Sequence, residues 1–181
     1  MQNLKNISQE ILHKLFDYNK CTGQLIRKPI DLEVYDMKTN QVNSWNAKNA
    51  GKVVGALTKK DGYLRCGVLG ETWLVHRLVW IYHNGYLDEN LDHINGIRSD
   101  NRIENLRKAK YRENSFNRGA QKNNTVGYKG VSIHKQTGKY RAKIWADKKQ
   151  HHLGLFLTAE LAHEAYCKAA TILHKEFAKF N

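Results

Sequence analysis

An aspartate and a histidine stand next to each other at positions 92 and 93, in a segment rich in asparagine and arginine. On the short strand that the pattern predicts here, neighbouring side chains point to opposite faces, so Asp92 and His93 do not pair with each other. They can act from two sides of a cleft: the carboxylate can bind a hard cation, and the imidazole can take up a proton near neutral pH. Hydrolysis of a phosphodiester bond needs both groups, whereas a purely structural loop would use the same polar residues to cap turns.

A longer pattern surrounds these two residues: residues 91–106 read LDHINGIRSDNRIENL, and the pair Glu113-Asn114 follows. This pattern resembles the HNH endonucleases of the phage and group I intron homing type. Further matches to that family lie upstream, at Phe16-Asp17-Tyr18 with Gly23, at Asp61-Gly62-Tyr63 and at Val75-His76-Arg77-Leu78-Val79-Trp80. The resemblance implies the α+β fold class, with a ββα-metal (His-Me finger) nuclease module in which a helix follows two strands.

The resemblance also implies roles for four residues. His93 would be the general base that activates water, and Asp92 and Asn114 would hold one divalent metal. Asn105 would fix the loop and the orientation of the His93 ring, because the partner of a histidine's second nitrogen selects the tautomer. Many HNH proteins have a histidine at the place of Asn114. An amide oxygen beside a carboxylate favours Mg²⁺ over Zn²⁺, and we expect Mn²⁺ to substitute.

The positive charge of the chain is concentrated in its C-terminal part. Of the 30 lysine and arginine residues 17 lie in residues 101–181, with only 6 of the 17 acidic residues, and the formal net charge is +13. A one-sided positive field attracts polyanions, of which nucleic acid is the commonest, although a solvated lysine-rich surface has the same composition. No apolar run reaches the roughly 18 residues of a membrane span. The three cysteines are too far apart in the sequence for a disulfide framework or a thiolate zinc site.

The length of 181 residues and the hydrophobic pattern predict two modules. Residues 1–114 are expected to form the nuclease module with an N-terminal α/β extension, followed by a basic linker over 115–126 and a second module over 127–181. In the extension, the pattern predicts a helix over 7–17, a loop over 18–50, strands over 53–57, 63–68 and 72–75, and a helix over 76–84.

The second module is predicted to be a small three-stranded antiparallel sheet packed on one helix, with strands over 129–134, 139–146 and 150–156. Alternation in the middle strand places basic residues on one face and apolar residues on the other, and a basic sheet face can enter the major groove of DNA. Through Tyr128-Lys129-Gly130-Val131 and Leu153-Gly154-Leu155-Phe156, the module resembles the plant Apetala/ethylene-response-factor DNA-binding domain. The positions with which that family reads bases are not matched, so its target sequence is not implied.

These patterns together predict a metal-dependent homing endonuclease that cuts double-stranded DNA. The residues expected to contact DNA are Arg98, Arg102, Arg107, Arg112, Lys129, Lys139, Arg141, Lys143, Trp145 and His151. Because the sequence holds a single set of catalytic residues, we expect a monomer that nicks one strand, in the cytoplasm of a phage-infected bacterial host and without a membrane partner. A DNA-binding regulator with an inactive nuclease module and an RNA-binding protein are the two alternatives.

Overall fold

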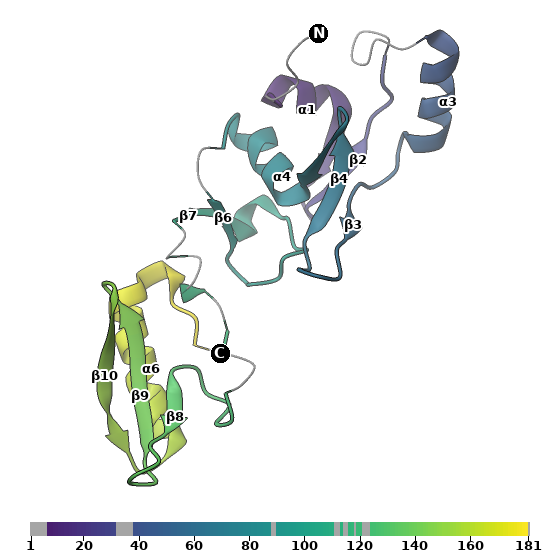
Figure 1. Cartoon of the computed structure of the whole chain (residues 1–181). Helices are drawn as coiled ribbons and strands as arrows, with labels where there is room; N and C mark the ends of the chain where they lie inside the picture. The colour runs from purple at the N-terminus through teal and green to yellow at the C-terminus, as the bar shows by residue number, and fades with distance from the viewer. Residues whose placement is uncertain are drawn as a thin grey trace. The chain divides into compact units, whose positions relative to one another are not determined.

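The computed structural model of the chain divides into two compact units, residues 1–108 and residues 109–181 (Figure 1). The residues that it describes are 7–31, 38–87, 90–110, 113, 116–117, 119–120 and 124–180. Helices are mixed with several small sheets rather than arranged around one large sheet. Among the described residues, no helix is long and apolar enough to cross a membrane. The predicted module boundaries at residues 114 and 127 stay predictions.

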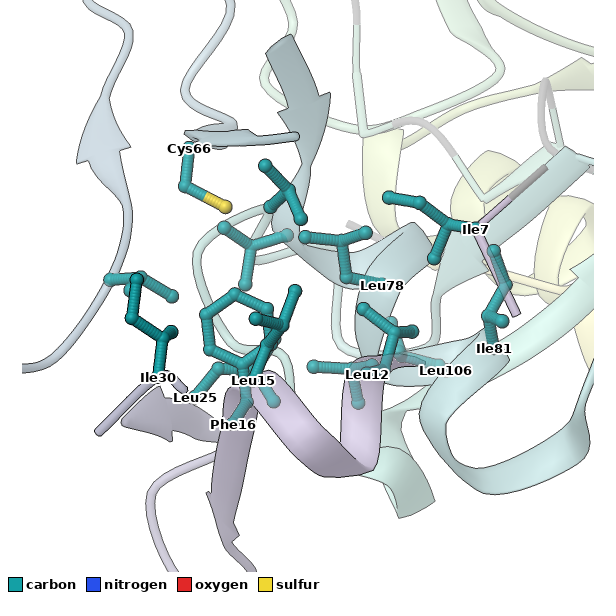
Figure 2. Packing of buried hydrophobic residues seen from close by; sticks show 14 of the residues in the cluster. Ile7, Leu12, Leu15, Phe16, Leu25, Ile30, Cys66, Leu78, Ile81 and Leu106 are labelled. Atoms are coloured by element: carbon teal, nitrogen blue, oxygen red, sulfur yellow. The ribbon is translucent and has the colours of Figure 1, made fainter. Parts of the chain in front are cut away.

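The core of the N-terminal unit forms where helix α1 (Gln9–Leu15) packs on helix α4 (Val75–Asn84). Ser8 begins α1 because its side chain accepts a hydrogen bond from the backbone N–H of Ile11. Helix α4 ends at Gly85, whose φ of 82° favours glycine. Large apolar side chains from the two helices and from the strands that follow α1 pack together here (Figure 2). They include Leu12, Leu15, Phe16, Leu25 and Leu78.

The sheets of this unit are short and antiparallel where their register is defined. A hairpin joins β1 (Phe16–Asn19) to β2 (Gln24–Arg27), and a second sheet has the order β3 (Ala56–Leu57), β4 (Leu64–Val68), β5 (Glu71–Leu74). A third sheet pairs β6 (Asn90–His93) with β7 (Leu106–Ala109), and the 3₁₀ turn η1 (Ile103–Asn105) precedes β7. The strands predicted over 63–68 and 72–75 and the helix predicted over 76–84 are therefore present, whereas the strand predicted over 53–57 covers only Ala56–Leu57.

One prediction for the N-terminal extension is confirmed only in part, and one is wrong. The helix expected over 7–17 ends at Leu15, and Phe16 already begins a strand. The loop expected over 18–50 contains both β2 and helix α3 (Thr39–Asn49). Helix α3 is polar and buries one side chain, Val42, so it has no apolar stripe from which periodicity could have revealed it.

The C-terminal unit is a three-stranded antiparallel sheet in the order β10 (Lys149–Phe156), β9 (Tyr140–Ala146), β8 (Val131–Ile133). Helix α6 (Ala159–His174) packs on one face of the sheet (Figure 1) and begins at Thr158, whose side chain accepts a hydrogen bond from the N–H of Leu161. Small residues allow this close packing, and those buried here include Ala142, Ala162 and Ala170. The predicted strands and helix of this unit are therefore present.

Gly130 is required where the chain enters β8. Its φ is +76°, and a Cβ at this position would lie 2.1 Å from Cδ2 of the buried Tyr166 ring on α6. We expect Gly130→Ala to destabilise the C-terminal unit by about 2–5 kcal/mol, because it combines an unfavourable φ with overpacking. Thermal or urea unfolding followed by circular dichroism measures this loss.

Gly138→Ala is the matched control for that prediction. Gly138 has a similar φ of +69°, but a Cβ there would meet no atom within 4 Å. Gly138→Ala should therefore cost about 1 kcal/mol, from the backbone strain alone. Equal losses in the two variants would contradict the role given to the contact with Tyr166.

Candidate active site

Strand β6 carries Asp92 and His93 into the interior of the N-terminal unit. Asp92 is 5% exposed and His93 is 3% exposed. The loop that joins β6 to β7 is closed at its base by a hydrogen bond of 2.9 Å from the N–H of Ile94 to the carbonyl of Asn105. Buried polar groups need partners, so the contacts of these two side chains define what they can do.

Arg107 on β7 holds the carboxylate of Asp92. Its Nε and Nη2 donate hydrogen bonds of 3.0 Å and 2.8 Å to Oδ2 of Asp92. The side chains are 15% and 6% exposed, so the pair compensates a charge that would be costly to bury alone. The sequence predicts that Arg107 contacts DNA. The structure places it on Asp92, where it fixes the orientation of the carboxylate.

His93 contacts Asn101, which lies in the loop between β6 and β7. Nε2 of the ring is 3.1 Å from Oδ1 of Asn101, and Asn101 is 2% exposed. Since a carbonyl oxygen only accepts, Nε2 carries the hydrogen and the basic lone pair is on Nδ1. Burial lowers the pKa of His93 below its usual value, against the opposing effect of the bond to Asn101. The ring is therefore neutral near pH 7, as a general base must be.

Two more rings lie beside His93. The ring centroids of His76 and Tyr63 are 5.0 Å and 5.9 Å from that of His93, and 5.1 Å from each other. Burial lowers the pKa of His76 to about 3, so a second neutral imidazole packs against the first. In the sequence, His76 lies in one of the upstream segments that match the HNH endonucleases. Its position next to His93 follows from the packing of α4.

Asn105 fixes the loop rather than the ring. Its Oδ1 accepts a hydrogen bond of 3.0 Å from the N–H of Asn95. Its Nδ2 donates to Oδ1 of Asn95 at 3.1 Å and to the carbonyl of Asp100 at 2.8 Å. The sequence predicts both a loop and a ring role for Asn105. In the structure the Asn105 amide bonds to other residues of the loop, and Asn101 contacts the His93 ring.

One of the acidic residues of this loop, Asp100, is also paired. Asp100 accepts hydrogen bonds from Nε and Nη2 of Arg102, at 2.9 Å and 2.6 Å, and from Nδ2 of Asn95 at 2.7 Å. The guanidinium of Arg102 is the main reason that the pKa of Asp100 is lowered to about 2. The loop is therefore held by charge-assisted bonds.

The arginines predicted to contact DNA in this unit make protein contacts. Besides Arg107 and Arg102, Arg98 donates a 2.7 Å hydrogen bond to the carbonyl of Asp61 and lies over the Tyr63 ring, 4.9 Å from its centroid. Arg112 lies outside the described residues. A DNA contact of Arg98, Arg102 or Arg107 would have to be made in addition to these bonds or in exchange for them.

The predicted metal ligands are described in part. Asp92 offers a carboxylate that Arg107 already orients, and Asn114 lies outside the described residues. Within the part of the chain that the structure describes, no three His, Cys, Asp or Glu side chains form a cluster able to hold a metal. A carboxylate with an amide oxygen and water still matches the all-oxygen chemistry of Mg²⁺.

The C-terminal unit presents a basic strand on the sheet face away from α6. Lys139, Arg141, Lys143 and Trp145 alternate with residues such as Ala142 and Ile144, which are buried towards the helix, and Trp145 is 57% exposed. On the neighbouring strand His152 lies opposite Lys143. We call Lys139, Arg141, Lys143, Trp145 and His152 the basic sheet face.

Two residues predicted to contact DNA do not belong to this face. His151 lies opposite the buried Ile144, on the helix side of the sheet, and its Nε2 is buried. Lys129 is half-buried and donates a 2.6 Å hydrogen bond to the carbonyl of Phe116, and burial lowers its pKa to about 8. The sequence does not show which of the two adjacent histidines faces outward, because the number of residues in the turn sets the register of the strand.

Comparison with known proteins identifies a family and a relative. Residues 74–116 match the HNH endonuclease family. The chain is 35% identical to Protein 3.8 of Escherichia phage T7 over 107 residues, which are 58% of this chain and 88% of that protein. No solved structure matches the chain. The HNH match includes α4, both strands of the β6–β7 pair and the loop with Asn101.

Proposed function

Because the chain belongs to the same family as Protein 3.8 of Escherichia phage T7 and carries an HNH endonuclease domain at residues 74–116, we propose that it is a metal-dependent DNA endonuclease of the homing type. The observation that carries this proposal is the buried His93 next to a carboxylate oriented by Arg107. A phage homologue also favours action in a phage-infected bacterial host, as the sequence predicts.

In the proposed reaction His93 takes a proton from water at Nδ1. The water oxygen forms a bond to phosphorus, and the bond from phosphorus to the leaving oxygen of the DNA strand breaks. Asp92 and Asn114 would hold one divalent metal, whose charge stabilises the developing negative charge on the phosphate and the leaving oxygen. Arg107 keeps the Asp92 carboxylate in place. Asn105 keeps the loop closed around the site.

The basic sheet face would bind the DNA target. Three cationic side chains and an exposed tryptophan, on β9 and at the residue before it, match a phosphate backbone with a base edge or sugar beside it. What supports this proposal is the sequence resemblance to the Apetala/ethylene-response-factor DNA-binding domain, together with the three strands and helix α6 of this unit. Double-stranded DNA is therefore the partner that we propose.

Incubation with supercoiled plasmid tests the proposed activity. We expect Mg²⁺ to support cleavage, Mn²⁺ to replace it and EDTA to abolish it, because the proposed ligands are oxygens. A single His93 acts on one phosphate at a time, so nicked circles should appear before any linear product. Binding without cleavage at every metal concentration would instead favour a DNA-binding regulator.

A further inference from the structure

The loop that carries Asn101 is held by the N-terminal hairpin, which lies outside the HNH match. The hydroxyl of Tyr18 on β1 accepts a 2.8 Å hydrogen bond from the N–H of Ile103 and donates a longer one, 3.4 Å, to the carbonyl of Asn101. Tyr18 and Ile103 are 85 positions apart in the sequence. A segment near the start of the chain thus fixes the backbone of the candidate site.

The turn of the hairpin also touches this backbone directly. A Cβ at Gly23 would lie 2.3 Å from the backbone N of Arg102 and 2.4 Å from the carbonyl carbon of Asn101. The φ of Gly23 is +71°, which also favours glycine. The two backbones are therefore in contact, and a side chain at position 23 would push them apart.

From this backbone the contact continues to His93. Asn101 is 2% exposed, so its amide has little freedom, and its Oδ1 lies 3.1 Å from Nε2 of His93. A bond from Nε2–H to a carbonyl leaves the basic lone pair on Nδ1. Loss of this bond removes the contact that favours the Nε2–H tautomer.

We propose that the β1–β2 hairpin positions the general base: Tyr18 and Gly23 hold the loop backbone, and Asn101 thereby keeps the His93 ring in the Nε2–H tautomer. Asn101, Tyr18 and Gly23 are positioning residues and do not touch the substrate. The inference rests on the proposed function for the role of His93 in cleavage. The tautomer itself can be measured whether or not the protein cuts DNA.

The first test compares Asn101→Leu with Asn101→Asp in the full chain at pH 8. Leucine has a similar size but no acceptor, whereas aspartate keeps an oxygen that accepts the bond from Nε2–H. Two-bond ¹⁵N–¹H correlation spectra report the tautomer of His93. We expect wild type and Asn101→Asp to show the Nε2–H form and Asn101→Leu to show a mixture. In plasmid cleavage, Asn101→Leu should lower kcat by about 10–100-fold with little change in KM.

The second test removes one hydroxyl of the hairpin. We expect Tyr18→Phe to lower kcat by about fivefold, the usual effect of one hydrogen bond, and to mix the tautomers of His93. Tyr86→Phe is the matched control, since Tyr86 is 63% exposed in the same unit, and it should behave as wild type. Because Tyr18→Phe removes a single atom, it decides the question even if Asn101→Leu does not fold.

Three results would overturn the inference: an unchanged tautomer in both Asn101→Leu and Tyr18→Phe, equal damage in Asn101→Asp and Asn101→Leu, or equal kcat in Tyr18→Phe and Tyr86→Phe. If wild type cuts no DNA under any condition, the proposed function fails. The spectra then decide by themselves whether the hairpin sets the tautomer of His93.

Discussion

His93→Ala is expected to slow plasmid cleavage by roughly two to four orders of magnitude while leaving the affinity for DNA nearly unchanged. General-base catalysis contributes about 10²–10⁴ to a rate, and alanine has no group that can take the proton. Single-turnover cleavage measures the rate, and an electrophoretic mobility shift measures the affinity. The effect should lie in the chemical step, because His93 is buried and offers little surface to bind DNA.

His13→Ala is a suitable control for this variant. His13 is an exposed histidine on α1, and its ring bonds to the carbonyl of Tyr82. Its removal should leave cleavage within about twofold of wild type, as for most exposed positions. Circular dichroism of His93→Ala should match wild type, which separates lost chemistry from lost structure. A rate close to wild type in a folded His93→Ala protein would exclude His93 as the base.

Removing the charges of the basic sheet face is expected to weaken DNA binding by about 10²-fold. The variant replaces Lys139, Arg141 and Lys143 with glutamine. Each lost phosphate contact costs about fivefold near 0.15 M salt, and the slope of log affinity against log salt should fall by about 3. The substitutions keep the strand length and leave the buried face of β9 intact. Affinity measured over a range of salt concentrations gives both quantities.

A second triple variant controls for net charge. Glutamine at Lys48 on α3, at Lys168 on α6 and at Lys175 removes the same number of charges from exposed positions off strand β9. We expect a smaller loss of affinity here, because these side chains act only through the long-range field. Equal losses in the two triple variants would show that binding depends on total charge and would contradict the basic sheet face as the binding surface.

The elements with strong periodicity could be predicted from the sequence. Helix α4 has an apolar face and a terminal glycine, and the C-terminal unit has alternating strands before an alanine-rich helix. Helix α3 and the β1–β2 hairpin could not be predicted in this way. Helix α3 has only Val42 and Trp45 as large apolar residues, and β1 has four residues that follow directly on α1. Their positions depend on tertiary contacts that no local pattern records.

The candidate site was predicted as a set of residues but not as a set of contacts. The motif identifies Asp92, His93 and Asn105, and the structure places all three on or beside the β6–β7 pair. The partners differ from the expectation, because Asn101 reaches the His93 ring and Arg107 the Asp92 carboxylate. These pairings depend on the path of the loop, which no spacing rule gives.

The hairpin holds the loop through main-chain atoms, which substitutions in the loop do not remove. Tyr18 and Gly23 meet the N–H, carbonyl and carbonyl carbon of residues 101–103. These groups are present whatever side chains the loop carries. Ile97 is 55% exposed on the same loop, so replacing it should leave the position of His93, the general base, unchanged. New DNA targets could thus be acquired by substitutions on the outer side of the loop while the cutting chemistry is inherited intact.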